Sequence, residues 1–347
     1  MRQTGVPFIF SPSQGTAACG RCRARSFFSV NREGKAGPRQ TGGSPSNVNE
    51  FLTSSGMLTS NWSNRMAHMD VQLLLLYLSP LFLVFIGWEM LYLRKHGAAY
   101  PTAGYQWKDL FANATLALMH QGGDALAAIA IAYLYDTLWG WRLFDIELNL
   151  WSLLLLFLLQ DLCYWLFHFA SHHVRWLWAS HVVHHSSERL NLSTAFRQSL
   201  MYPVSGMWLF WIPMILIGFP PEAVVATVLL SLGFQFFVHT QVVGKLGKLE
   251  WIFNTPSHHR VHHASNARYI DRNFAGVLII WDRLFGTFVE EDLGEPCRFG
   301  ITKPIHSFNP LTLTFHEWRD MLQEARGLPW RQKLAVLFGK PAGPTSG

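Results

Sequence analysis

The stretch "YWLFHFASHHVRWLWASHVVHHSSE", residues 164–188, places six histidines directly after a long apolar run. His168 and His172 are four residues apart, so on a helix that continues the apolar run they share one face. His181, His184 and His185 have the i, i+3, i+4 spacing, which also places them on one helical face. The fold must therefore explain why imidazoles gather where an apolar segment ends.

A second stretch, "NTPSHHRVHH" at residues 254–263, repeats the i, i+3, i+4 spacing with His259, His262 and His263. It also contains His258, and His239 stands at the end of another apolar run. Neutral imidazole binds Fe, Zn, Cu and Ni, and nine or ten histidines exceed what one ion binds. Carboxylates are scarce around these groups, so the pattern predicts an all-nitrogen di-iron centre that activates O₂ beside a lipid chain.

The composition indicates a membrane protein. The chain has 347 residues, of which 50% are hydrophobic and 14% charged, whereas a soluble domain carries about 25% charged residues. Five apolar runs occupy residues 71–93, 113–138, 150–167, 204–219 and 222–238. We therefore predict an all-α integral membrane protein with a bundle of about four to five transmembrane helices and a cytoplasmic helical cap that holds the di-metal site.

The distribution of basic residues predicts an orientation. Alternating crossings place the Lys- and Arg-containing segments 94–108, 175–197 and 245–272 on one side, which the positive-inside rule makes cytoplasmic. The histidine groups lie at that same end of the runs. The net charge is +6, and the basic residues flank apolar segments without forming a dense stripe. This distribution indicates anionic lipid as the partner and not nucleic acid.

Three regions follow from these patterns. Residues 1–69 lack apolar periodicity and are predicted to be a disordered or mis-annotated N-terminal tail. Residues 70–243 are predicted to form the transmembrane bundle with the first two histidine groups. Residues 244–347 are soluble in character and are predicted to form the cytoplasmic C-terminal cap with the third group.

Four ionisable residues outside the histidine groups are candidates for supporting the metal site or binding the substrate. Asp161 precedes His168 by two helical turns and is predicted to accept its N–H, the alternative being a helix–helix hydrogen bond. Glu188 follows the second histidine group, where it orients an imidazole, reaches a metal or is only a loop residue. His120 and Asp124, at i and i+4 in the second run, line a polar cavity, contact a lipid headgroup or bond across the bundle.

The three histidine boxes resemble those of the fatty acid hydroxylase / sterol desaturase superfamily. Two further stretches, "NFAGVLIIWDRLFGTF" at 273–288 and "ITKPIHSFNP" at 301–310, are most similar to its alkylglycerol monooxygenase branch. The resemblance implies a di-iron centre whose ligands are His168, His172, His181, His184, His185, His239, His259, His262 and His263. It implies for His258 a supporting or alternate-ligand role.

The resemblance also implies an activity. It predicts a membrane-bound, multi-pass oxygenase that uses two iron ions and O₂ to hydroxylate an aliphatic C–H of a lipid, whether an alkyl ether lipid, a fatty acyl chain or a sterol-like molecule. No Gly-rich dinucleotide fingerprint is present, so electrons come from outside, from tetrahydrobiopterin or a reductase partner. A lipid or carotenoid desaturase on the same fold, and a non-catalytic membrane metal-binding protein or transporter, remain the alternatives.

Overall fold

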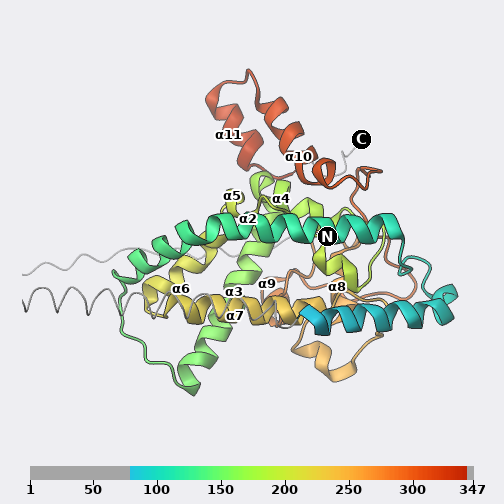
Figure 1. Cartoon of the computed structure of the whole chain (residues 1–347), viewed down its shortest axis with the longest axis horizontal. Helices are drawn as coiled ribbons and strands as arrows, with labels where there is room; N and C mark the ends of the chain where they lie inside the picture. The colour runs from blue at the N-terminus through green and yellow to red at the C-terminus, as the bar shows by residue number, and fades with distance from the viewer. Residues whose placement is uncertain (1–78, 342–347) are drawn as a thin grey trace, which may run out of the picture. The chain divides into compact units, whose positions relative to one another are not determined.

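The computed structural model describes residues 79–341, and within them the chain is helical, with two isolated β-bridges and no strand. The predicted tail, residues 1–69, and the start of the first apolar run lie outside the described residues. Figure 1 shows the arrangement. The elements are the helical residues 79–96, η1 (Gly97–Ala99), α2 (Trp107–Trp139), α3 (Leu150–His173), α4 (Arg175–His185), η2 (Leu192–Phe196), α5 (Tyr202–Ser205), η3 (Met207–Trp211), α6 (Ile212–Ile217), α7 (Pro221–Phe236), η4 (Gly247–Trp251), α8 (Pro256–His262), α9 (Ile280–Phe285), α10 (Pro310–Ala325) and α11 (Trp330–Phe338).

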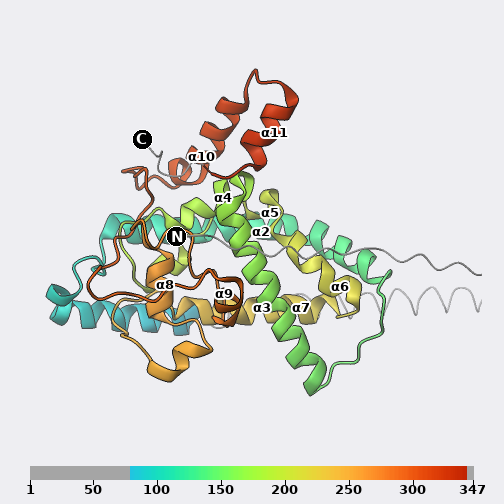
Figure 2. The ribbon, with the colours of Figure 1, turned by 180° about the vertical axis from the view of Figure 1, so that it is seen from behind.

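Helices α3 and α4 carry the first two histidine boxes and are joined by a single residue. Asn149 caps α3 by accepting hydrogen bonds from the backbone N–H groups of Trp151 and Ser152, which would otherwise lack partners. Val174 is extended and ends α3, after which α4 begins in a new direction. The bend is visible in Figure 2. It brings Nε2 of His181 on α4 to 2.9 Å from Nε2 of His168 on α3.

The core lies between α2, α3, α6 and α7. Leu156 of α3, Met214 and Ile215 of α6 and Val224 of α7 are buried in one cluster with Tyr135 of α2. Burial of an aliphatic side chain of this size stabilises a fold in water by about 1.5–3 kcal/mol. The cluster fixes α3 across α2 and α7, as both views show.

The apolar run at 204–219 is not one continuous helix. Gly206, with a φ of +87°, separates α5 from η3, which runs directly into α6, and Gly218, with a φ of +132°, ends α6. Within residues 79–341, α3 is the one helix long and apolar enough to cross a bilayer, while α7 and the segment Met207–Ile217 are shorter. The predicted count of about four to five spans is therefore not confirmed.

The C-terminal helices pack on α4. Arg175, at the start of α4, donates hydrogen bonds of 2.8 Å to Glu317 and 2.6 Å to Glu324, both on α10. Its backbone N–H also donates to the carbonyl of Gly339, which follows α11. These bonds fasten α10 and α11 to the helix that carries the second histidine box (Figure 1).

Candidate metal centre

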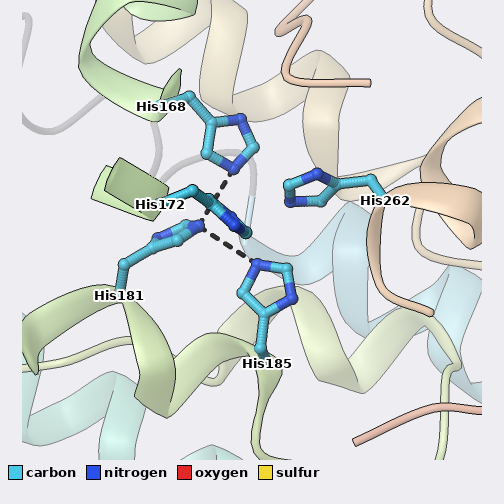
Figure 3. Close-up of side chains that lie close together, drawn as sticks. All are labelled: His168, His172, His181, His185 and His262. Atoms are coloured by element: carbon cyan, nitrogen blue, oxygen red, sulfur yellow. Dashed lines mark hydrogen bonds between the residues drawn. The ribbon is translucent and has the colours of Figure 1, made fainter. Parts of the chain in front are cut away.

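The nine histidines of the boxes and of residue 239 come together in two adjacent groups. None is more than 7% exposed, and the potential ligand atoms within each group lie within 4.8 Å of one another. The first group is His168, His172, His181, His185 and His262, shown in Figure 3. The second group is His184, His239, His259 and His263.

The ring atoms that converge are the Nε2 atoms. In the first group, Nε2 of His181 lies 2.9 Å from that of His168 and 3.2 Å from that of His185. In the second, Nε2 of His239 lies 3.1 Å from that of His184 and 2.9 Å from that of His259. Two neutral imidazoles share at most one hydrogen between such a pair, so several lone pairs point at a common centre.

Four of the opposite ring atoms, the Nδ1 atoms, bind backbone carbonyls. His168 donates to the carbonyl of Phe274 at 2.8 Å, and His239 donates to that of Gln235 at 2.7 Å. His184 and His262 likewise donate to backbone carbonyls, at 3.2 and 3.0 Å. A hydrogen bond at Nδ1 fixes the tautomer that leaves Nε2 free to bind a metal.

Burial keeps these imidazoles neutral. It lowers the pKa of His181, His185 and His259 well below 6.5, and neighbouring histidines lower each pKa further. Burial also lowers the pKa of His239 to about 4. Since only the neutral ring binds a metal, the site is ready for ligation at neutral pH.

The donor set fits metal ions better than a metal-free polar core. Nε2 of His172 and Nε2 of His262 are buried with no hydrogen-bond partner, and an unpaired buried polar group costs free energy. A metal ion bound to the first group would satisfy both atoms. Five and four nitrogen ligands suit two transition-metal ions, and imidazole is a common ligand of iron, zinc and copper.

Two side chains that the sequence analysis did not single out support the rings. The hydroxyl of Tyr202 lies 2.8 Å from Nδ1 of His181, and the carboxylate of Asp271 lies 3.4 Å from Nδ1 of His172. Although burial raises the pKa of Asp271, contacts with His172 and Lys340 lower it overall to about 2. Neither residue belongs to a histidine box, so only the tertiary structure reveals them.

A buried ion pair holds the carbonyl that His184 uses. The guanidinium of Arg197 donates to Asp109 at 3.1 Å and to Asn113 at 2.8 Å, both on α2. Arg197 is 1% exposed, so loss of either charge would leave the other buried and unpaired. The ion pair therefore holds the backbone carbonyl of Arg197 in place against His184 of the second group.

Asp161 does not contact His168. Its carboxylate accepts hydrogen bonds from the backbone N–H groups of residues 277 and 278, at 2.8 and 3.0 Å. Asp282 accepts from the N–H of Phe274 at 2.9 Å. The two carboxylates together hold the loop whose Phe274 carbonyl receives His168, so Asp161 lies one step further from the ligand than we predicted.

The other two predicted supporting residues lie outside both groups. The Glu188 side chain is 64% exposed and lies 3.6 Å from the ring of His306. His258 is buried, and its ring meets that of Phe288 edge to face. His120 and Asp124 pair with each other at 3.4 Å and line a cavity described next.

Two cavities border the histidine groups, and they share no lining residue. One of about 190 Å³ is walled mainly by apolar side chains of α2, α3, η3 and α7, and it touches His181, His184 and His239. The other, of about 460 Å³, lies between α4 and α10 and touches His172 and His185. The second cavity is lined by charged residues of both signs, including Asp271, Lys303, Glu317, Arg319, Asp320 and Lys340.

The helices thus gather buried histidines beside an apolar cavity, which defines a candidate metal centre. Residues 153–287 match the family model described as fatty acid hydroxylase. Alkylglycerol monooxygenase of Homo sapiens is 42% identical over 213 residues, which cover 60% of this chain and 46% of that protein. The predicted resemblance to this superfamily and to its alkylglycerol monooxygenase branch is confirmed.

Other relatives agree. Alkylglycerol monooxygenase of Danio rerio is 44% identical over 194 residues, which cover 55% of this chain and 42% of that protein. Ornithine lipid hydroxylase OlsE of Rhizobium tropici is 31% identical over 126 residues, 36% of this chain and 38% of that protein. The chain thus spans less than half the length of these curated relatives. No solved structure matches it.

Proposed function

We propose that this protein is a membrane-bound di-iron oxygenase that uses O₂ to hydroxylate an aliphatic C–H of a lipid, with an alkyl glycerol ether as the favoured substrate. The observation that carries the proposal is the convergence of nine buried imidazoles, three of which line an apolar cavity. Similarity to proteins named alkylglycerol monooxygenase supports the substrate class.

The nine histidines would hold the two iron ions, and the ions would supply the activation of O₂. The reaction balances as C–H plus O₂, two electrons and two protons giving C–OH and water. Oxidation at the carbon beside an ether oxygen gives a hemiacetal, which collapses to a fatty aldehyde and a glycerol product. The chain's own residues orient the ligand rings, hold the alkyl chain and exclude water from the apolar cavity.

The proposal includes a membrane location. Leu118, Leu126 and Ile129 on α2 and Trp151 on α3 are between 75% and 87% exposed, and such exposed apolar surface indicates contact with lipid. We propose a multi-pass protein with the metal centre on the cytoplasmic side and α10 and α11 in a cap. The cavity of charged lining under α10 suits a water-soluble electron donor, a reduced pterin or a reductase protein.

The test compares lipids and O₂ uptake in membranes that contain the full-length protein or its His262→Ala variant. His96→Ala is the matched control, because His96 is exposed and bonds only within its own helix. We expect aldehyde release and O₂ uptake with the wild type and the control, and loss of both with His262→Ala. Equal O₂ uptake and lipid profiles in all three would refute the oxygenase.

The same samples separate the alternatives. A desaturase would give a product lighter than the substrate by H₂ and carrying no new oxygen. A non-catalytic metal-binding protein or transporter would bind metal without O₂ uptake. Purified wild-type protein is expected to contain two iron ions per chain, and a content well below two metal ions would contradict a binuclear site.

A further inference from the structure

The apolar cavity is lined by a polar pair whose two side chains are 15% and 38% exposed. His120 and Asp124 stand one helical turn apart on α2, with Nε2 of His120 3.4 Å from Oδ2 of Asp124. The remaining polar atoms, Nδ1 of His120 and Oδ1 of Asp124, are buried and have no hydrogen-bond partner. Among residues 79–341, the structure therefore shows no hydrogen bond from His120 or Asp124 across the bundle, which was one of the three alternatives for this pair.

The surroundings make such a pair costly to the fold. The cavity walls include Phe82, Phe167 and Trp211, and an unpaired polar atom among apolar groups raises the free energy of the folded state. Neither member of the pair belongs to the histidine groups. An ionisable pair in an apolar helix that makes no hydrogen bond to any other described residue indicates that the pair recognises a ligand.

The pair lies close to the metal centre. The ring of His120 meets that of Tyr202 edge to face at 5.7 Å, and the Tyr202 hydroxyl lies 2.8 Å from Nδ1 of His181. A single side chain therefore separates the pair from a metal-binding ring. At about 190 Å³ the cavity is smaller than a typical ligand site of about 300–1,000 Å³, so it holds the reacting part of a lipid and not the whole molecule.

The unpaired atoms of His120 and Asp124 define which chemical group the bound part of the lipid carries. An ionised Asp124 presents an acceptor at Oδ1, and a neutral His120 whose Nε2–H faces Asp124 presents an acceptor at Nδ1. A hydroxyl donates to such acceptors, whereas an ionised carboxylate or phosphate offers acceptors alone and is repelled by an ionised Asp124.

Resting on the proposed function, we propose that His120 and Asp124 recognise an uncharged hydroxyl of the lipid close to the carbon that is oxidised. The pair sets substrate specificity, because a lipid without a donor at that place leaves buried acceptors unpaired. It holds the substrate and takes no part in the chemistry of O₂.

The test uses one pair of lipids, an alkyl glycerol ether with free hydroxyls and the same ether with its hydroxyls O-methylated. For the wild type we expect kcat/KM to be about 10- to 100-fold higher for the free hydroxyl, carried mainly by KM. The double variant His120→Phe, Asp124→Leu should turn over both lipids alike, and Asp124→Asn should reduce the preference. Metal content and thermal unfolding establish that each variant is folded.

Gln160→Leu is the matched control. Gln160 is a buried α3 side chain whose polar atoms also lack partners, but it does not line this cavity, so its loss should leave the preference unchanged. An unaltered preference in the double variant and in Asp124→Asn overturns the proposal, as does an equal loss on both lipids. If the wild type oxidises neither lipid, the proposed function itself fails; equal oxidation of both refutes only the role of the pair.

Discussion

The hydroxyl of Tyr202 provides the sharpest test of how the protein prepares its ligands. Tyr202 is 4% exposed, and its hydroxyl lies 2.8 Å from Nδ1 of His181. Tyr202→Phe removes that oxygen and changes little else in the packing. His181 then has no partner at Nδ1 and no preference for the tautomer that frees Nε2.

Loss of a hydrogen bond to a metal-binding histidine lowers metal affinity by about 10- to 100-fold, which corresponds to about 1.4–2.8 kcal/mol. Competition with a chelator, with metal content measured at each chelator concentration, reports this change directly. We expect the variant to release metal at a chelator concentration lower by the same factor.

Tyr135→Phe is the control for a simple loss of stability. Tyr135 is 3% exposed and donates its hydroxyl to the carbonyl of Trp208 at 2.6 Å, away from the histidines. Both variants should lose about 0.5–3 kcal/mol of unfolding free energy, but only Tyr202→Phe should lose metal affinity. If the two variants bind metal equally well, the reasoning about Nδ1 is wrong.

Further predictions concern the third histidine box, acidity and His258. Arg260→Met leaves the buried carboxylate of Glu291 without its paired guanidinium, now at 2.6–2.7 Å, and should cost about 3–5 kcal/mol in chemical unfolding; Arg260→Met combined with Glu291→Met should recover much of that loss. The pKa of His239 falls from 6.5 unfolded to about 4 folded, so below pH 6.5 the unfolded chain binds more protons. As the pH falls from 6.5 to 4, the unfolding free energy of the metal-free protein should therefore decrease by about 1.4 kcal/mol per pH unit for each such histidine. An unfolding free energy that does not change with pH would contradict this. His258→Phe should keep the full metal content, and a loss of one ion would show that His258 is a ligand.

The sequence predicted which histidines come together because their signal is local, but not how they divide, since His184 lies in a different group from His181 and His185. The i, i+3, i+4 spacing survives in any helix, so the residues on each face could be named, and the structure gathers the same nine rings. The supporting contacts carry no such signal. Four of the nine Nδ1 atoms bind backbone carbonyls, as at Phe274, and a carbonyl is present in every residue.

The errors of placement arise from tertiary contacts as well. Helical periodicity correctly put Asp161 below His168, but the carboxylate turns to the backbone of residues 277 and 278, more than a hundred positions away. The run at 204–219 was predicted as one apolar segment, yet the positive φ angle of Gly206 interrupts it and that of Gly218 ends its last helix. Hydropathy measures composition and does not register where a backbone changes direction.

The absence of a shared lining residue between the two cavities has a kinetic consequence. Different histidines line each cavity, so under the proposed function a lipid bound in one cavity would not obstruct a water-soluble donor bound in the other. Each reactant should then saturate the protein independently, in either order of arrival, and an excess of one should not inhibit by occupying the place of the other.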